Sequence, residues 1–207
     1  MTETGASVTG EPDASGRGPY AKGVARRRQI IESAIAEFAE RGVDGTSLRT
    51  LGEAIGVSHA TLRHYFASRD ELLVEVYRAH EERDPADSPS DRGAVEVMTA
   101  SADINRAIPG LVRLYATLTT DALQEDHPAS REFIRERFRA VREDLARRIR
   151  DGQASGRIAS DIDATDAAAL VIAASDGLQV QWLLDPDEVD VRRALTLLER
   201  LLPGSAG

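Results

Sequence analysis

The sequence predicts an all-α fold of about nine helices in two parts, a small N-terminal unit and a larger helical region. Apolar residues recur at the three- and four-residue spacing of amphipathic helices along most of the 207 residues. Breaks rich in glycine, proline or serine separate these segments, and none shows the alternation typical of a strand. We expect a disordered, weakly apolar tail at residues 1–21, a compact unit at 22–80 and a second region at 81–207.

Residues 46–72 carry the most specific pattern, because they predict two very short helices that meet at a glycine. Gly56 stands where the first helix must end, in a left-handed conformation that glycine adopts at little cost. Ser58 is a typical N-cap for the second helix. We expect these helices at about 47–54 and 58–64. The apolar residues that would bury them are Leu48, Leu51, Ile55, Leu62 and Phe66.

Further helices are expected on both sides of this pair. An apolar stripe predicts one at about 23–41, and the capping box formed by Ser68 and Glu71 predicts another that extends to Arg83. A helix, a turn and a second helix are typical of a unit that presents one helix to DNA. The spacing alone fits a small helical core equally well.

The stretch from Arg26 to Arg78 resembles the N-terminal DNA-binding domain of the tetracycline-repressor (TetR) family of transcriptional regulators. It departs from the family at Arg63, where tyrosine is usual, at Tyr65, where histidine is common, and at Arg69, where lysine is usual. All three replacements keep a side chain that can donate to a phosphate. The positions that carry the resemblance are Ile31, Ala34, Phe38, Gly42, Thr46, Ser47, Gly56, Val57, Ser58, Leu62, Phe66, Ser68 and Leu72.

This resemblance implies a regulator, a repressor in most relatives, that binds a pseudopalindromic operator as a dimer and is released by a small-molecule effector. We expect His59 and His64 to contact base edges, Ala60 to let the helix lie deep in the major groove, and Thr61 to contact a phosphate or a thymine methyl. Each could instead be an ordinary exposed side chain. The full set of expected DNA contacts is Thr46, Arg49, Ser58, His59, Ala60, Thr61, Arg63, His64, Tyr65 and Arg69.

The charge of the chain is compatible with DNA binding once its distribution is considered. The net charge is −9. Residues 22–80 hold nine basic and eight acidic side chains, net +1, whereas residues 81–207 hold 16 basic and 24 acidic side chains, net −8. The acidity is therefore remote from the expected DNA face, and a basic run from Arg17 to Arg28 precedes it.

The second half predicts helices at about 92–102, 104–126 with a disturbance near Pro109 and Gly110, 130–152, 164–184 and 188–202, with Pro186 and Asp187 opening the last one. The last two resemble the helix pair through which the family dimerises, although an apolar stripe near a C-terminus also fits an intramolecular core. The expected interface residues are Leu170, Ala174, Leu178, Leu195, Leu198 and Leu202.

The resemblance further implies that a small molecule binds among the central helices. Apolar and aromatic residues at helical spacing are more often ordinary core than pocket lining. The candidates are Met98, Leu114, Tyr115, Leu118, Phe133, Phe138, Gln179 and Trp182. A second function remains open, a helical dimer that binds a small molecule or a partner without specific DNA recognition.

Several function classes lack their motifs in this sequence. There is no cysteine, the segment that starts at His80 lacks the second histidine of a zinc-protease motif, and no phosphate loop or nucleophile elbow is present. We therefore expect no enzymatic activity, cofactor or metal. No apolar run approaches the length that spans a bilayer and the N-terminus does not resemble a signal peptide, so we expect a cytoplasmic protein.

Overall fold

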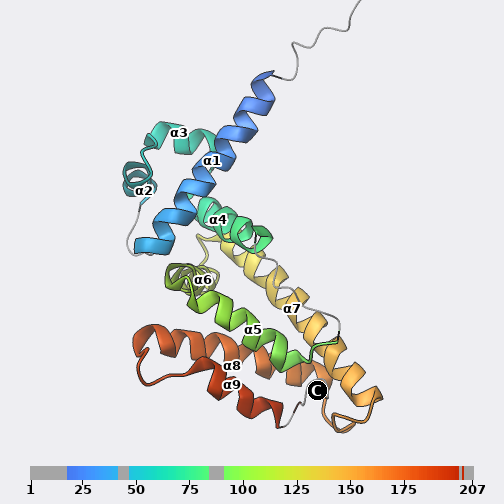
Figure 1. Ribbon diagram of the computed structural model, residues 1–207. Coiled ribbons are helices and arrows are strands. Elements are labelled where there is room, and N and C mark those ends of the chain that lie inside the picture. Colours follow the sequence, from blue (N-terminus) through green and yellow to red (C-terminus); the bar gives the residue numbers. More distant parts are fainter. Residues whose placement is uncertain (1–17, 42–46, 84–90, 201, 203–207) are drawn as a thin grey trace, which may run out of the picture.

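A computed structural model describes residues 18–41, 47–83, 91–200 and 202, and over these residues the fold is all α-helical, as expected. The expected tail at 1–21 lies mostly outside the described residues. The nine helices in this part of the chain (Figure 1) are α1 (Gly18–Arg41), α2 (Leu48–Ala54), α3 (His59–Tyr65), α4 (Arg69–Arg83), α5 (Ala94–Arg106), α6 (Pro109–Asp121), α7 (Pro128–Ala154), α8 (Ala164–Leu184) and α9 (Val191–Glu199).

Several helix boundaries differ from the sequence prediction, and two of the differences have clear local causes. The disturbance expected near Pro109 divides the helix expected at 104–126: α5 ends at Arg106, and Pro109 begins α6, where the missing N–H of proline costs nothing. The last helix begins at Val191 instead of Pro186, since the Asp190 side chain caps it by accepting a hydrogen bond from the Arg193 amide at 3.0 Å.

The helix α4 lies at the centre of the molecule and links its two ends. It packs against α1 on one side and against α6 and α7 on the other, while α8 and α9 lie at the opposite end from α2 and α3 (Figure 1). One apolar core joins α1–α4 to α6 and the start of α7, and a second joins α5, the later part of α7, α8 and α9. The first core therefore crosses the expected boundary near residue 80, and the division into two functional units stays a prediction.

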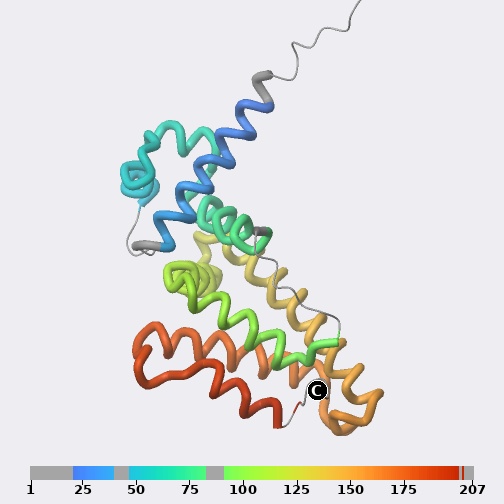
Figure 2. Tube along the Cα trace, viewed as in Figure 1, coloured from blue at the N-terminus to red at the C-terminus, as the bar shows by residue number. Residues whose placement is uncertain are grey.

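A close backbone approach fixes the end of α1 against the start of α6. A Cβ atom added to Gly110 would lie 1.8 Å from the carbonyl oxygen of Phe38, which only glycine avoids. Figure 2 traces the end of α1 to a position beside α6. The position of the N-terminal helices is thus set by direct backbone contact with the second half of the chain.

The helix α8 corrects the expectation that no apolar run approaches membrane-spanning length. Its 21 residues are long and apolar enough by composition to cross a bilayer, and it is the one such helix in the described part of the chain. It packs against α5, α6, α7 and α9, and core helices of globular proteins pass the same test.

Candidate DNA interface and central polar cluster

The turn between α2 and α3 has the geometry that the sequence predicts. Gly56 has a φ of +68°, and the Val57 amide donates to the Gly52 carbonyl at 2.7 Å. The Ser58 hydroxyl caps α3 by accepting from the Thr61 amide at 3.1 Å. The turn also requires glycine at position 52, because a Cβ there would lie 2.4 Å from the Val57 carbonyl oxygen. Sequence reasoning did not identify Gly52.

The helix α3 buries one edge and exposes the other. Leu62 and Phe66 are buried beside Leu51. The opposite face exposes His59, Ala60, Arg63 and His64, while Thr61 and Tyr65 are half-buried. On α2, Arg49 is exposed and pairs with Glu53 one turn later at 3.1 Å. Thr46 lies outside the described residues. The expected DNA-contacting residues of α3 are therefore brought to one side of the molecule.

Arg69 lies differently from the other expected phosphate contacts. It is the first residue of α4, and its guanidinium lies 3.7 Å from the carboxylate of Asp121 on α6. Only 27% of its side chain is exposed, whereas Arg63 is exposed on α3. A phosphate contact by Arg69 stays a prediction, and any phosphate would compete with Asp121 for the same guanidinium.

Arg27 is a residue of this unit that the prediction did not single out, although the basic run before the helix pair pointed to it. Its guanidinium lies 5.0 Å from the ring centroid of Phe66, at the end of α3, and 2.8 Å from a carboxylate oxygen of Glu75 on α4. Glu75 also faces Arg78 at 3.7 Å, and Arg78 reaches Glu136 on α7 at 3.8 Å. A chain of charges thus runs from α1 through α4 to α7.

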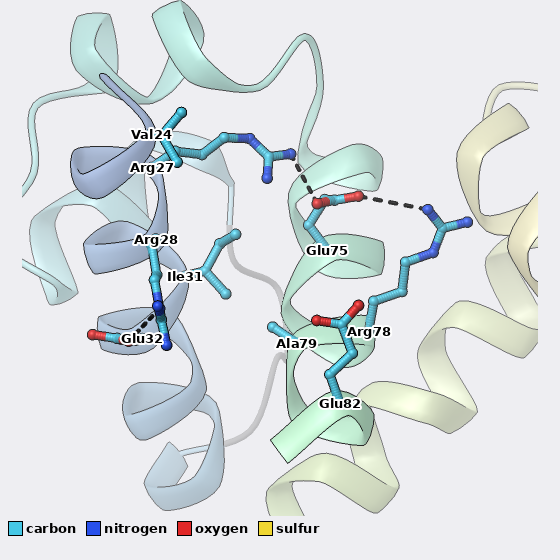
Figure 3. A pocket seen from close by; sticks show the side chains of 9 residues that line it. All are labelled: Val24, Arg27, Arg28, Ile31, Glu32, Glu75, Arg78, Ala79 and Glu82. Carbon is cyan, nitrogen blue, oxygen red and sulfur yellow. Dashed lines mark hydrogen bonds and ion pairs between the residues drawn. The ribbon is translucent and has the colours of Figure 1, made fainter. Parts of the chain in front are cut away.

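A groove of about 740 Å³ lies between α1 and α4 beside this chain of charges (Figure 3). Ile31 and Ala79 form part of its apolar floor, and Arg27 reaches across to Glu75. Its three arginines and three glutamates balance one another in charge. The groove is the seam between α1 and α4. Its lining residues are Val24, Arg27, Arg28, Ile31, Glu32, Glu75, Arg78, Ala79 and Glu82.

Comparison with known proteins identifies this arrangement. Residues 30–76 match the family model for bacterial regulatory proteins of the tetR family, and residues 91–205 match the model for the C-terminal region of BetI-type transcriptional repressors. The chain belongs to the TetR family. This TetR-family chain is accordingly a DNA-binding transcriptional regulator of the helix-turn-helix type, and the family is one of transcriptional regulators.

Relatives of this TetR-family chain include two transcriptional repressors named AcnR. The one from Corynebacterium diphtheriae is 25% identical over 87% of this chain and 93% of its own, and the one from Corynebacterium jeikeium is 30% identical over 67% and 71%. Among solved structures, the multidrug binding protein EbrR, in complex with imidazole, matches with a TM-score of 0.58 and 25% identity over 87% of this chain and 97% of its own.

The expected effector-binding residues are divided between the two cores. Leu114, Leu118 and Phe133 are buried in the first core, while Met98 and Trp182 are half-buried at the second. The central carbon of the Arg106 guanidinium lies 5.8 Å from the ring centroid of Trp182. The role of these expected residues in effector binding stays a prediction.

Three other expected effector contacts have specific neighbours. Gln179 is buried and accepts a hydrogen bond from Asn105 at 2.8 Å, which ties α8 to α5. Phe138 lines a groove of about 680 Å³ along α7 and packs at the edge of both cores. Tyr115 is half-buried and belongs to a polar cluster between the central helices.

That central polar cluster consists of Tyr77, Glu81, Tyr115, Arg137 and Asp176, from α4, α6, α7 and α8. The two tyrosine rings stack with centroids 5.3 Å apart, and the Tyr115 hydroxyl donates to Asp176 at 3.2 Å. Burial raises the pKa of Tyr115 to about 12 and raises the pKa of Tyr77 further above its ordinary range. Burial also raises the pKa of the Asp176 carboxyl, which the positive charge of Arg137 opposes.

Sequence reasoning found only Tyr115 of this cluster. One signal was available for Asp176, which is an acid in the middle of the otherwise apolar segment AAALVIAASDGLQVQWLL. A carboxylate at such a position has to face a polar partner or solvent. Nothing in the spacing of Arg137 separated it from the many exposed arginines of α7.

The predicted dimer residues differ in their exposure. Leu195 and Leu202 are buried inside the second core of the same chain, and a dimer contact by them stays a prediction. Ala174, Leu178 and Leu198 are half-buried, and Leu170 is 68% exposed. The small and apolar side chains that α8 does expose recur at three- and four-residue spacing and form what we call the α8 stripe: Leu170, Ala173, Gly177, Val180 and Leu184.

Proposed function

We propose that this chain is a ligand-responsive repressor that binds a pseudopalindromic operator as a cytoplasmic homodimer and is released by a small-molecule effector. The observation that carries the proposal is the exposed face of α3. His59, Arg63 and His64 are exposed on a helix whose opposite edge is anchored by the buried side chains of Leu62 and Phe66. Such a helix enters the major groove with its side chains already placed for base and phosphate contacts.

The DNA contacts are proposed as two groups. His59, Thr61 and His64 read base edges, with Ala60 permitting close approach. Thr46, Arg49, Arg63 and Tyr65 contact phosphates and set the register, and Ser58 is a further candidate contact at the start of α3. The relatives named transcriptional repressors support repression as the regulatory outcome.

An anisotropy titration with DNA that flanks the chain's own gene, at two salt concentrations, tests the DNA-binding part. We expect sequence-selective binding that weakens steeply with salt, because several phosphates are neutralised. Equal, weak binding to unrelated DNA would contradict specific recognition and would favour a helical ligand-binding dimer.

The homodimer is proposed to form through the α8 stripe. Its 3-4-3-4 spacing places Leu170, Gly177 and Leu184 along one seam, and the small residues Ala173 and Gly177 let a second helix approach closely. α9 adds Leu197, which is 63% exposed. A two-fold dimer would present two α3 helices to the two half-sites of an operator.

A matched pair of substitutions tests this dimer. Leu170→Asp places a charge in the stripe, whereas Leu123→Asp does so between α6 and α7, where Leu123 is 85% exposed. In sedimentation velocity we expect Leu170→Asp to sediment as a monomer and to lose operator affinity, with Leu123→Asp matching the wild type. A Leu170→Asp variant that remains a dimer would refute the assignment.

The effector response is proposed to pass through α4. This helix follows α3 directly in the sequence. It packs against α6 and α7, where the effector is expected to bind. A ligand can shift the two DNA-binding units only through a difference in its affinity for two arrangements of these helices. The similar protein EbrR, which is named a multidrug binding protein, supports a small molecule as the signal.

A further inference from the structure

The guanidinium of Arg137 occupies an aromatic and acidic site between α4, α6 and α7. Its central carbon lies 5.1 Å from the ring centroid of Tyr115 and 5.5 Å from that of Tyr77. Glu81 forms an ion pair with the same guanidinium. Stacked rings beside a carboxylate are how proteins bind organic cations, because the ring faces and the carboxylate both attract positive charge. Here a side chain of the protein itself takes the place of such a cation.

The charge around this site is not balanced. The central polar cluster contains one guanidinium, that of Arg137, and two carboxylates, Glu81 and Asp176. Glu81 pairs with Arg137, while Asp176 accepts a hydrogen bond from Tyr115 and, among the described residues, forms no ion pair. The positive charge of Arg137 acts on Asp176 without pairing directly with it, and a largely buried carboxylate that lacks a direct cationic partner is costly. A second cation that reached Asp176 would remove that cost.

The site is also accessible from one side. The Arg137 and Glu81 side chains are 22% and 34% exposed, whereas Tyr77 is only 4% exposed beneath them. The guanidinium and its carboxylate therefore form the outer layer of the site, between α4 and α7. An arginine side chain is long and can swing into solvent while its backbone stays in place.

We propose that this cluster is the effector site and that its ligand is a planar organic cation, such as an amidinium or a guanidinium, which displaces the Arg137 side chain from the rings of Tyr77 and Tyr115. The inference rests on the proposed ligand-responsive function and specifies its ligand class. The ligand stacks on the two rings and pairs with Asp176 and Glu81. Neutral and anionic compounds of the same shape are excluded by the unpaired carboxylate.

Displacement of Arg137 has a direct structural consequence. The ion pair of Arg137 with Glu81 joins α7 to the last turns of α4, and Tyr77 lies on the same helix one turn earlier. A ligand that takes the place of Arg137 exchanges this inter-helix bond for contacts of its own. The position of α4, and with it that of α3, then depends on whether the site holds the ligand or the arginine.

Isothermal titration with benzamidine, using the full chain, tests the ligand class. Benzamide and benzoate serve as neutral and anionic compounds of nearly the same shape. We expect benzamidine to bind and the other two not to bind. Equal binding of benzamide or benzoate, or no binding of benzamidine, would overturn the proposal.

Substitutions of Asp176 and Arg137 test the roles of these residues. Asp176→Asn removes the unpaired charge and is expected to weaken benzamidine binding at least about tenfold, while Asp166→Asn, at an exposed position of the same helix, leaves it unchanged. Arg137→Ala removes the competing cation and is expected to strengthen binding about tenfold. If Arg137→Ala fails to fold, Arg137→Met keeps the apolar stem and serves the same purpose. Weaker binding in the arginine variant would refute the displacement.

Operator binding, measured in parallel, distinguishes the proposed regulatory function from the proposed cation site. Benzamidine binding that depends on Asp176 without any change in operator affinity would leave the cation site intact and refute its role in regulation. Normal operator binding without benzamidine binding would refute the cation site alone.

Discussion

The carboxylate of Asp70 caps the N-terminus of α7 by accepting hydrogen bonds from Ser130. The Ser130 amide lies 3.2 Å from both oxygens of Asp70, its hydroxyl donates to the same carboxylate, and the Ala129 amide donates at 2.9 Å. Asp70 is the second residue of α4, five positions after the end of α3. The start of the central helix is therefore fixed to the start of α7 by one buried side chain.

We expect Asp70→Ala to lower the free energy of unfolding by about 2 kcal/mol, because three donors lose their acceptor in a buried setting. Urea denaturation measures this loss. Asp161→Ala, at an exposed position between α7 and α8, is the control and is expected to change stability by less than about 0.5 kcal/mol. Equal stability of the two variants would contradict the capping role.

We expect a glycine-to-alanine substitution to have opposite effects on stability at Gly56 and at Gly23. Both have open space where a Cβ would be added, so only the backbone decides the outcome. Gly56→Ala is expected to cost about 1 kcal/mol, because alanine resists a φ of +68°. Gly23→Ala, inside α1, is expected to stabilise the chain by about 0.5–1 kcal/mol. Thermal unfolding of both variants checks the signs, and a stabilising Gly56→Ala would refute the left-handed turn.

Arg63 and Arg69 are expected to differ in their effect on the salt dependence of DNA binding. Arg63 is exposed on α3, so Arg63→Ala should weaken binding to all sequences and reduce the slope of log affinity against log salt by about one. Arg69 faces Asp121 and should contribute less to the slope. Anisotropy titrations at four salt concentrations measure both. A larger loss of slope in Arg69→Ala would show that this arginine leaves Asp121 when DNA binds.

The parts of the fold that sequence could predict are those that local chemistry determines. Gly56, Ser58 and the Ser68–Glu71 cap act within a few residues of themselves, and the structure confirms each of them. Apolar spacing likewise predicted the bounds of α8. Only the three-dimensional packing decides which apolar face of a helix stays in contact with water. Leu195 and Leu202 therefore belonged to the core, although their spacing equally fitted a dimer surface.

Long-range hydrogen bonds and ion pairs could also not be predicted from the sequence. Asp70 and Ser130 are 60 residues apart in the sequence. Arg69 on α4 lies close to Asp121 on α6. Nothing in the local pattern distinguishes such an acid from the many that cover exposed helix faces. The central polar cluster remained hidden for the same reason, since it needs α4, α6, α7 and α8 to meet.

Asp176→Asn is expected to stabilise the free protein while it removes the negative charge that a cationic effector would use. Burial raises the pKa of Asp176 in the folded state above the ordinary value of 3.8, so folding favours the protonated form. The carboxyl therefore contributes most stability below pH 3.8 and loses that contribution as the pH rises and it ionises.

At pH 7 an asparagine, which still accepts the Tyr115 hydrogen bond, should raise the melting temperature by about 2–4 °C. The advantage of asparagine should shrink as the pH is lowered from 7 towards 4, because the wild-type carboxyl becomes protonated. Calorimetry of both proteins over this range measures the difference. An Asp176→Asn variant that is less stable at pH 7 would mean that the carboxylate stabilises the fold, and the argument for a cation at this position would lose its energetic basis.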